Sequence, residues 1–331
     1  MKKYHVYGIG NALVDMEFEV GDDFLRQHEI QKGGMTLVDE ARQEHLLNAL
    51  TTGVVKRQCG GSAANTMIAV GQMGGKCFYS CRVANDAQGD FYAADLTEAG
   101  VDSNLKAARP AGTTGKCLVL ITPDAERSMN TFLGITSAFS TAELDEVALA
   151  DAQYLYIEGY LAASSTAQEA AVRAREVARK NGVKIALTFS DASMLNFCGD
   201  GLKRLLGDGV DLLFCNETEA TTWAGTKDLG VAREALKKVA KTFVITLGEN
   251  GAMIFDGVTF IDIEPYKVKA IDSNGAGDMF AGAFLYALTH GHSHATAGKL
   301  ASMAASKVVS QYGPRLKWHQ TQEVLNAVIP R

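Results

Sequence analysis

The chain has 331 residues, of which 47% are hydrophobic and 21% charged, a globular composition that excludes a disordered chain and favours one large domain with at most a small appendage. Its 32 basic and 38 acidic residues give a net charge of −6 without a long basic run, so we expect no nucleic-acid partner. Six cysteines without CxxC spacing indicate reduced thiols in a cytoplasmic protein, and no apolar run is long enough to predict a membrane partner.

Strand-like segments alternate with helical ones along the chain. The segment YHVYGIG begins the series, and YLYIEGY, VKIALTF, VDLLFCN and TFVITLG follow it. The helical stretch 165–182 carries its alanines on one side and its charges on the other, and Asn181-Gly182 ends it. This alternation predicts βαβ crossovers, hence an α/β fold whose mostly parallel sheet is covered on both faces.

Two segments break this rhythm. Residues 13–38 contain two runs of alternating apolar and polar residues, and residues 112–133 contain a hairpin pattern that turns at Pro123-Asp124. We interpret both segments as a small β-layer inserted into the body. Residues 1–12, 39–111 and 134–331 would then form the large domain.

Two glycine-rich stretches lie in the first 70 residues. In GIGNALVD, Leu13 occupies the third glycine position of the dinucleotide fingerprint, which excludes that assignment but leaves Asn11 and Asp15 at a strand end. Asp15 is equally well explained as a turn residue or as an acceptor for a ligand hydroxyl. In CGGSAANT, residues Gly60 and Gly61 precede Ser62, a predicted helix N-cap, and Asn65 falls in the first turn; a loop with a capped helix explains this stretch alone.

Two further stretches carry acids at helix starts. In NETEA, residues Asn216 and Glu219 suit water-mediated Mg²⁺ binding, although an acidic helix start is an equal alternative. In DSNGAGDMF, the amides of residues 275–277 would face a phosphate at a helix N-terminus, and Asp278 follows them. An anion site beside a carboxylate suits phosphoryl transfer to an alcohol, whereas the simpler reading of Asp278 is an acid that complements the helix dipole.

Taken together, these stretches resemble the ribokinase-like (PfkB) carbohydrate and nucleoside kinases, and within them the adenosine kinase branch. GGSAANT resembles the first family signature and DSNGAGDMFAGAFL the second, while NETEA and TLGENGA occupy the positions of the Asn-x-x-Glu motif and of a nucleotide-contacting strand end. The resemblance spans essentially the whole chain. It implies a three-layer α/β body with a β-lid that binds ATP and a hydroxylated substrate in the cleft between them.

The same resemblance implies roles for individual residues. Those at the phosphoryl group are Asp278 as general base, Gly275, Ala276 and Gly277 as the anion hole, and Arg127 as a lid arginine that reaches the phosphates. Those at the substrate hydroxyls are Asn11, Asp15, Gly60, Gly61 and Asn65, with Glu158 where ribokinases have a sugar-contacting acid. Those at the nucleotide and metal are Asn216 and Glu219 for Mg²⁺ through water, Thr246, Gly248 and Gly251 for ATP, and Asp272 for a monovalent-cation loop that would hold K⁺.

These roles lead to an expected activity, the ATP-dependent phosphorylation of the 5′-hydroxyl of a purine nucleoside, with adenosine as the first candidate. A sugar kinase acting on ribose, fructose or a keto-deoxy sugar acid is the alternative, and a non-catalytic nucleotide-binding protein is a third hypothesis. A purine needs flat apolar walls, for which the expected lid offers Phe18, Met35, Leu37 and Phe132. The sequence leaves open whether the protein is a monomer or a homodimer.

Overall fold

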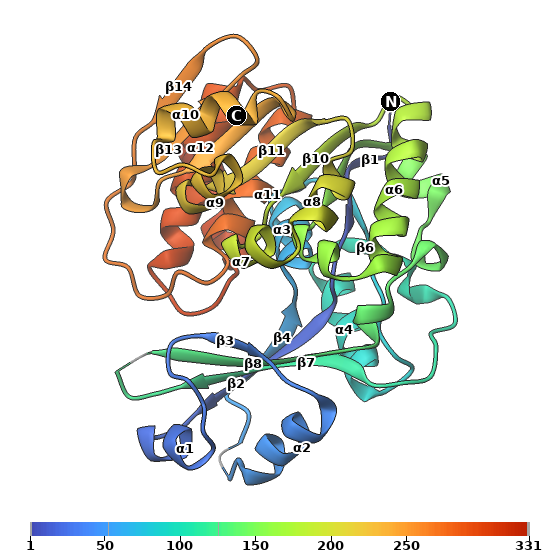
Figure 1. Ribbon diagram of the computed structural model, residues 1–331, viewed down its shortest axis with the longest axis vertical. Coiled ribbons are helices and arrows are strands. Elements are labelled where there is room, and N and C mark those ends of the chain that lie inside the picture. Colours follow the sequence, from blue (N-terminus) through green and yellow to red (C-terminus); the bar gives the residue numbers. More distant parts are fainter. Residues whose placement is uncertain (1, 52, 125, 330–331) are drawn as a thin grey trace.

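The computed structural model describes residues 2–51, 53–124 and 126–329, and these residues form a large and a small β-sheet (Figure 1). The large sheet has the strand order β14-β13-β12-β11-β10-β9-β1-β5-β6. Its strands from β12 to β6 are parallel, whereas β13 and β14 each pair antiparallel with the strand before them. The bounds are β1 (Tyr4–Ile9), β5 (Cys77–Ser80), β6 (Val101–Ser103), β9 (Ala152–Ile157), β10 (Lys184–Thr188), β11 (Val210–Asn216), β12 (Ala240–Thr246), β13 (Ala252–Phe255) and β14 (Phe260–Ile263).

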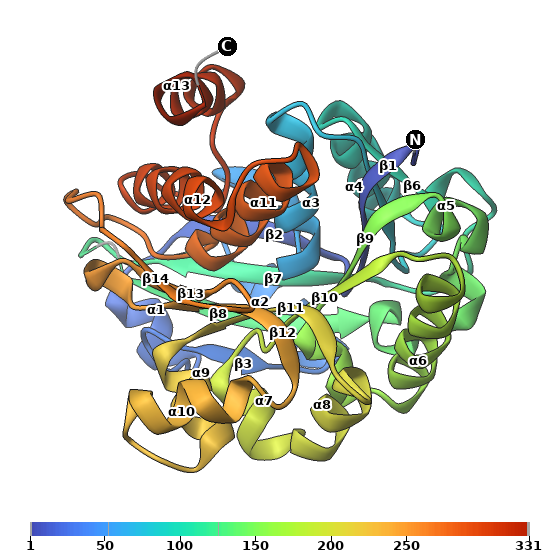
Figure 2. The ribbon, with the colours of Figure 1, turned by 90° about the horizontal axis from the view of Figure 1, so that it is seen from above.

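Helices cover both faces of the large sheet, as Figure 2 shows. One face carries α3 (Ser62–Gln72), α4 (Ala87–Glu98), α11 (Ala276–Thr289) and α12 (His294–Val309), with α13 (Trp318–Val328) packed on α12. The other face carries α5 (Glu146–Ala150), α6 (Ser165–Lys180), α8 (Gly199–Leu206), α9 (Glu217–Ala224) and α10 (Leu229–Leu236). Successive strand residues point to opposite faces, so Tyr156 joins the first core while Leu155 and Ile157 join the second. The predicted parallel sheet between two helical layers is therefore confirmed.

Short helical segments complete this part of the fold. Helix α7 (Ala192–Phe197) follows β10, and single 3₁₀ turns cover Asn104–Lys106, Ile135–Ala138, Thr141–Glu143, Gly159–Ala163 and Gly248–Asn250. The predicted helix at 165–182 is α6: Ser164 caps its start, its alanines face the core, and Gly182 adopts a left-handed φ of 64° just after its end.

The small sheet has five strands in the order β3-β8-β7-β2-β4. Their bounds are β2 (Leu13–Glu19), β3 (Met35–Leu37), β4 (Lys56–Gly60), β7 (Thr114–Ile121) and β8 (Arg127–Gly134). Helices α1 (Asp22–Gln27) and α2 (Glu40–Ala49) lie on the side of this sheet that is turned away from the large sheet (Figure 1). Alternate residues of β2, such as Val14 and Phe18, are buried in the same apolar core as Leu25 of α1 and Leu46 of α2.

The boundary drawn at residue 38 between the two domains is wrong. Strand β4 pairs antiparallel with β2, with Leu13 opposite Gly60, so the first segment of the small sheet extends to Gly60. Helix α2 also belongs to this unit, because it packs against β8. The strand was missed because its first residues, Lys56, Arg57 and Gln58, are all polar and show no alternation.

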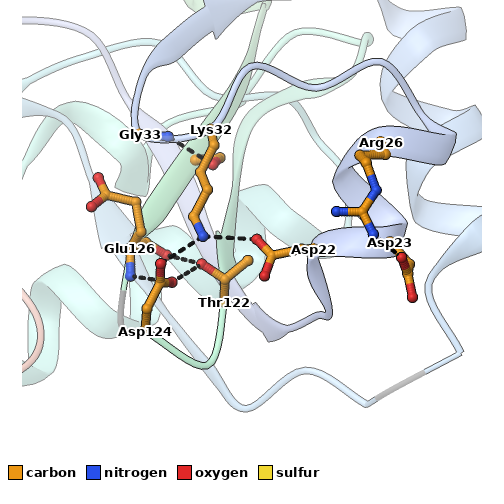
Figure 3. A network of polar contacts seen from close by, with 9 residues as sticks. Asp22, Asp23, Arg26, Lys32, Gly33, Thr122, Asp124 and Glu126 are labelled. Atoms are coloured by element: carbon orange, nitrogen blue, oxygen red, sulfur yellow. Dashed lines mark hydrogen bonds and ion pairs between the residues drawn. The ribbon is translucent and has the colours of Figure 1, made fainter.

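The outer end of the small sheet is closed by a polar network that links α1, the α1–β3 connection and the β7–β8 turn (Figure 3). Lys32 Nζ lies 2.7 Å from Asp22 Oδ1 and 2.6 Å from Asp124 Oδ2, and Thr122 Oγ1 donates to Asp124 Oδ1 at 2.6 Å. Arg26 pairs with Asp23 nearby. These charges are largely exposed, so each pair contributes at most about 1 kcal/mol to stability.

Within residues 2–51, 53–124 and 126–329, no helix combines the length and the apolarity needed to cross a bilayer. All six cysteines are unpaired; five are buried and Cys198 is partly exposed.

Candidate active site

A cavity of about 480 Å³ lies between the small sheet and the carboxyl ends of β1, β9, β10, β11 and β12. The carboxyl ends of parallel strands are where open α/β sheets hold ligands. The residues with an implied role that line it are Asn11, Asp15, Gly61, Asn65, Glu158, Asn216, Glu219, Thr246, Gly275, Gly277 and Asp278. The structure thus brings together side chains from motifs that are far apart in the sequence.

Close packing of α3 against α11 brings the two glycine-rich motifs together. A Cβ added at Gly282 of α11 would lie 2.6 Å from Ala69 Cβ and 2.7 Å from Thr66 O of α3, so only glycine permits this approach. Both helices begin at the cavity, α3 after Gly61 and α11 after Gly275. Their N-terminal dipole ends therefore favour negative charge at the same place.

Asp278, in the first turn of α11, is held by two side chains of α3. Ser62 Oγ donates to its Oδ1 at 2.6 Å, and Asn65 Nδ2 donates to its Oδ2 at 3.1 Å. Burial raises the pKa of Asp278 to about 6, although both hydrogen bonds act in the opposite direction. The predicted N-cap role of Ser62 is wrong: Gly61 is the N-cap residue of α3, and the Ser62 hydroxyl is directed to Asp278 instead.

The turn before α11 presents backbone amides to the cavity. Gly275 is the N-cap residue with a left-handed φ of 75°, and in the described part of the chain the amides of Gly275 and Gly277 have no main-chain or side-chain acceptor. Ala276 differs, because its amide donates to Ser273 O at 3.3 Å. Two of the three predicted donors are therefore available to an anion.

A second carboxylate, Glu158, lies at the end of β9. Its Oε2 accepts the Ala63 amide at 2.8 Å, and its Oε1 accepts the Asn11 amide at 3.3 Å and Asn11 Nδ2 at 3.2 Å. Burial raises its pKa to about 7. Asn11 and Glu158 thus form one hydrogen-bonded unit on the cavity wall.

Asp15 comes from the small sheet and faces the same space. Burial raises its pKa to about 7, with neighbouring Arg315 acting in the opposite direction. Gly60 does not line the cavity but allows Asp15 to lie there, since a Cβ at Gly60 would be 2.1 Å from Asp15 Oδ1. The carboxyl groups of Asp15, Glu158 and Asp278 leave this wall rich in hydrogen-bond acceptors.

Asn216 and Glu219 form a reciprocal cap at the start of α9. Asn216 Oδ1 accepts the Glu219 amide at 2.8 Å, and the Asn216 side chain and backbone donate to the Glu219 carboxylate at 2.8 and 3.1 Å. Burial raises the pKa of Glu219 to about 7. In the described residues no group of three acidic, histidine or cysteine side chains has metal-ligand geometry. The pair therefore fits a Mg²⁺ ion that keeps its water shell, as this ion prefers, and not a direct coordination site.

Six residues with implied roles do not line the cavity: Gly60 and Ala276, described above, and Gly248, Gly251, Arg127 and Asp272. Gly248 and Gly251 flank it beyond Thr246, and Gly251 packs against β14, where a Cβ would be 2.0 Å from Ile263 O. Arg127 and Asp272 are paired with each other at 3.3 Å outside the cavity.

The small sheet lines the cavity with aliphatic and sulfur-containing side chains. Of the predicted apolar wall, Met35 and Leu37 face the cavity, whereas Phe18 and Phe132 are not among its lining residues and Phe18 is buried on the opposite face. Sequence reasoning missed the rest of this wall, which consists of Leu13, Cys117, Val119, Met129, Thr131 and Leu133. These residues occupy every second position along β2, β7 and β8, a pattern that the sequence shows. The pattern alone did not tell which of the two alternate sets of side chains faces the cavity.

The large domain contributes further lining residues that the motifs did not indicate. They include Tyr156, Tyr160, Ala163, Thr188, Ser190, Asp191, Met194 and Phe214. Ser190 is one of two non-glycine residues in the described chain with a positive φ, 68°, and its hydroxyl accepts the Gly159 amide at 2.9 Å. Ser190 and Asp191 come shortly after β10, which ends at Thr188, so the rule that polar residues gather after parallel strands would have found them.

The chain belongs to the pfkB family of carbohydrate kinases, whose model matches residues 38–321. A probable sugar kinase from Rhizobium etli is 33% identical, with a TM-score of 0.89 and coverage of 99% of both chains. An adenosine kinase from Sinorhizobium meliloti is 32% identical, with a TM-score of 0.89 and coverage of 98% of this chain and 99% of that one. The adenosine kinase of Saccharomyces cerevisiae is 27% identical over 92% of this chain and 95% of its own. The protein is thus a phosphotransferase that acts on an alcohol group.

Proposed function

We propose that the protein is an ATP-dependent kinase that phosphorylates the 5′-hydroxyl of a purine nucleoside, with adenosine as its preferred acceptor. The observation that carries this proposal is the position of the Asp278 carboxylate, buried in the cavity beside the free amides of Gly275 and Gly277. A carboxylate and an anion hole side by side are what transfer of a phosphoryl group to an alcohol requires.

In the proposed reaction, Asp278 accepts the proton of the acceptor hydroxyl while the hydroxyl oxygen bonds to the γ-phosphorus and the bond to the β-phosphate oxygen breaks. With a pKa of about 6, Asp278 is ionised near neutral pH and ready to take this proton. The amides of Gly275 and Gly277 hold the γ-phosphate oxygens, and the dipole of α11 adds to their positive potential. The products are ADP and a phosphate monoester.

On the nucleotide side, Thr246 and the Asn216–Glu219 pair would hold ATP and the hydrated Mg²⁺. When bound, the Mg²⁺ ion neutralises negative charge on the phosphates. On the acceptor side, Asn11, Asp15, Asn65 and Glu158 offer carboxylate and amide groups to ribose hydroxyls. The protein would act in the cytoplasm, consistent with its six unpaired cysteines.

The apolar wall of the small sheet supports a nucleoside acceptor over a free sugar. The apolar side chains on this side of the cavity are those of Met35, Leu37, Val119, Met129 and Leu133. They would offer the hydroxyls of a free sugar no hydrogen-bond partners there. The S. meliloti and yeast relatives, both adenosine kinases, support the same acceptor.

A sugar kinase is the second candidate, and a specific residue supports it. Glu158 is buried in the cavity wall, where a carboxylate would suit an additional sugar hydroxyl. The R. etli relative is described as a probable sugar kinase. Ribose, fructose and keto-deoxy sugar acids are the acceptors to compare.

The decisive experiment is a coupled assay of ADP formation with adenosine, inosine, guanosine, ribose and fructose as acceptors. We expect adenosine to give the highest kcat/KM and its product to carry the phosphate on the 5′-oxygen, which ³¹P and ¹H NMR would identify. A higher kcat/KM for ribose or fructose would replace the nucleoside by the sugar. ATP binding without turnover on any acceptor would instead identify a non-catalytic nucleotide-binding protein.

A further inference from the structure

Arg127 begins strand β8 of the small sheet, yet its guanidinium is turned to the loop in front of α11. Its Nη1 lies 3.3 Å from Asp272 Oδ2 and 3.4 Å from Glu17 Oε1, and all three side chains are nearly buried, with exposed fractions of 10%, 5% and 7% for Arg127, Asp272 and Glu17. The guanidinium also lies 5.5 Å from the ring centroid of Tyr312. A charge of the small sheet is thus held by a carboxylate of the large domain.

Asp272 in turn shapes the segment that leads to the anion hole. Its Oδ1 accepts the Asn274 amide at 3.0 Å and its Oδ2 accepts the Gly313 amide at 2.8 Å. The amides of Ile271 and Asp272 both donate to Val309 O, at 2.7 and 3.1 Å. Gly275 then passes so close to the 309–314 segment that a Cβ would lie 2.3 Å from Pro314 Cβ. The position of the Gly275 and Gly277 amides therefore depends on the Asp272 carboxylate.

We propose that Arg127 is a positioning residue that acts through Asp272, so that the small sheet fixes the turn carrying the anion hole. This inference rests on the proposed function, because it concerns how the same site is held. Arg127 compensates two buried carboxylates at once, and removing it would leave Asp272 beside Glu17 without a cation. Asp272 would then lose the interaction that joins its loop to the small sheet.

The same contacts bear on the monovalent cation that the family resemblance implies at Asp272. Both oxygens of this carboxylate already accept backbone amides, and Arg127 supplies a fixed positive charge 3.3 Å away. These residues do not fit a site for K⁺, since an added cation would face a guanidinium and two N–H groups. We therefore expect turnover without a requirement for K⁺.

The test is a double-mutant cycle with Arg127→Met, Asp272→Asn and the double variant. Each single change should lower kcat between about tenfold and 100-fold, as expected when reacting groups are misplaced by about 1 Å. The double variant should lose no more than the worse single variant, because both changes break one interaction. Arg127→Lys should recover part of the loss, whereas Arg26→Met, which removes an exposed arginine of the same unit (Figure 3), should leave kcat unchanged.

Three outcomes would overturn the inference. If the losses of the single variants multiply in the double variant, Arg127 acts on the phosphates independently of Asp272. If Arg127→Met lowers the melting temperature but leaves kcat of the folded enzyme unchanged, its role is only structural. If replacing K⁺ by Na⁺ or tetramethylammonium abolishes turnover, Asp272 does hold a cation.

The proposed function and this inference can fail separately. Should the wild-type protein phosphorylate no acceptor, the cycle can still be measured on the Kd of ATP by calorimetry and on the melting temperature. Coupling between Arg127 and Asp272 in ATP affinity would then uphold the positioning role although the kinase assignment had failed. Additive changes in ATP affinity would refute the positioning role by itself.

Discussion

The sharpest prediction concerns the replacement of Asp278 by asparagine. The change keeps the size of the side chain but removes the proton acceptor, a loss that typically slows a reaction by about 10²- to 10⁴-fold, equivalent to about 3–5 kcal/mol of transition-state stabilisation. With a pKa of about 6, most of the wild-type carboxyl groups are ionised at pH 7.5, so most of the loss should appear in kcat at that pH.

The same substitution has a structural cost that can be separated from catalysis. An asparagine offers one acceptor oxygen, which would serve Asn65 Nδ2, and its own amide would donate to Ser62 Oγ, since a hydroxyl also accepts. Both contacts remain but change from charge-assisted to neutral hydrogen bonds, so the melting temperature should fall by at most a few degrees without unfolding of the protein.

The assay combines kcat and KM from coupled ADP release, the Kd of ATP by calorimetry and the melting temperature by scanning fluorimetry. We expect a large fall in kcat with an ATP Kd close to that of the wild type. A variant that binds ATP normally and retains kcat within about threefold would refute the assignment of Asp278 as the base, since such a small change is about 0.6 kcal/mol.

Three further predictions follow from the site and its packing. Ser62→Ala removes a hydrogen-bond donor that lowers the pKa of Asp278, so the acidic limb of the pH profile of kcat/KM, near pH 6 in the wild type, should move up by as much as about one pH unit. Ser62→Thr should restore the wild-type limb. An unshifted limb in Ser62→Ala would contradict this role of Ser62. The pKa of Glu158 is raised to about 7, so the folded state binds more protons than the unfolded chain between about pH 4.5 and 7, and stability from this group is lost as the pH rises through that window. Glu158→Gln should therefore flatten the decline in melting temperature between pH 5 and 8, and an equally steep decline would refute the burial argument. Gly282→Ala should lower the free energy of unfolding in urea by about 1–3 kcal/mol, because its Cβ would meet α3. Gly199→Ala should not lower it in this way, since a Cβ there would have no heavy atom within 4 Å. Equal effects of the two changes would contradict the close packing of α3 on α11.

The elements that the sequence predicts well are those with a local signal. β-rich runs separated by helix-length segments were enough to predict the parallel sheet, and paired glycines before an apolar helix were enough to locate both motifs. Asn11 was placed at a strand end, and it lies on the cavity wall, whereas the role of Glu158 came only from the family resemblance.

What the sequence could not predict depends on contacts between distant segments or on the phase of a pattern. Strand β2 has apolar residues on both faces, Leu13 as well as Val14 and Phe18, so alternation alone did not tell which set faces the cavity. Strand β4 is defined by its pairing with β2 and not by its polar residues. The partner of Ser62 is 216 positions away, and no local rule connects them.

The packing of α3 on α11 has a consequence for synthesis of the chain. Helix α3 is almost entirely buried, and much of its cover comes from residues near position 282, which leave the ribosome long after residue 72. Until then α3 can pack only on β1, β4, β5 and β6, so we expect the side of α3 that α11 covers to stay exposed until translation is nearly complete.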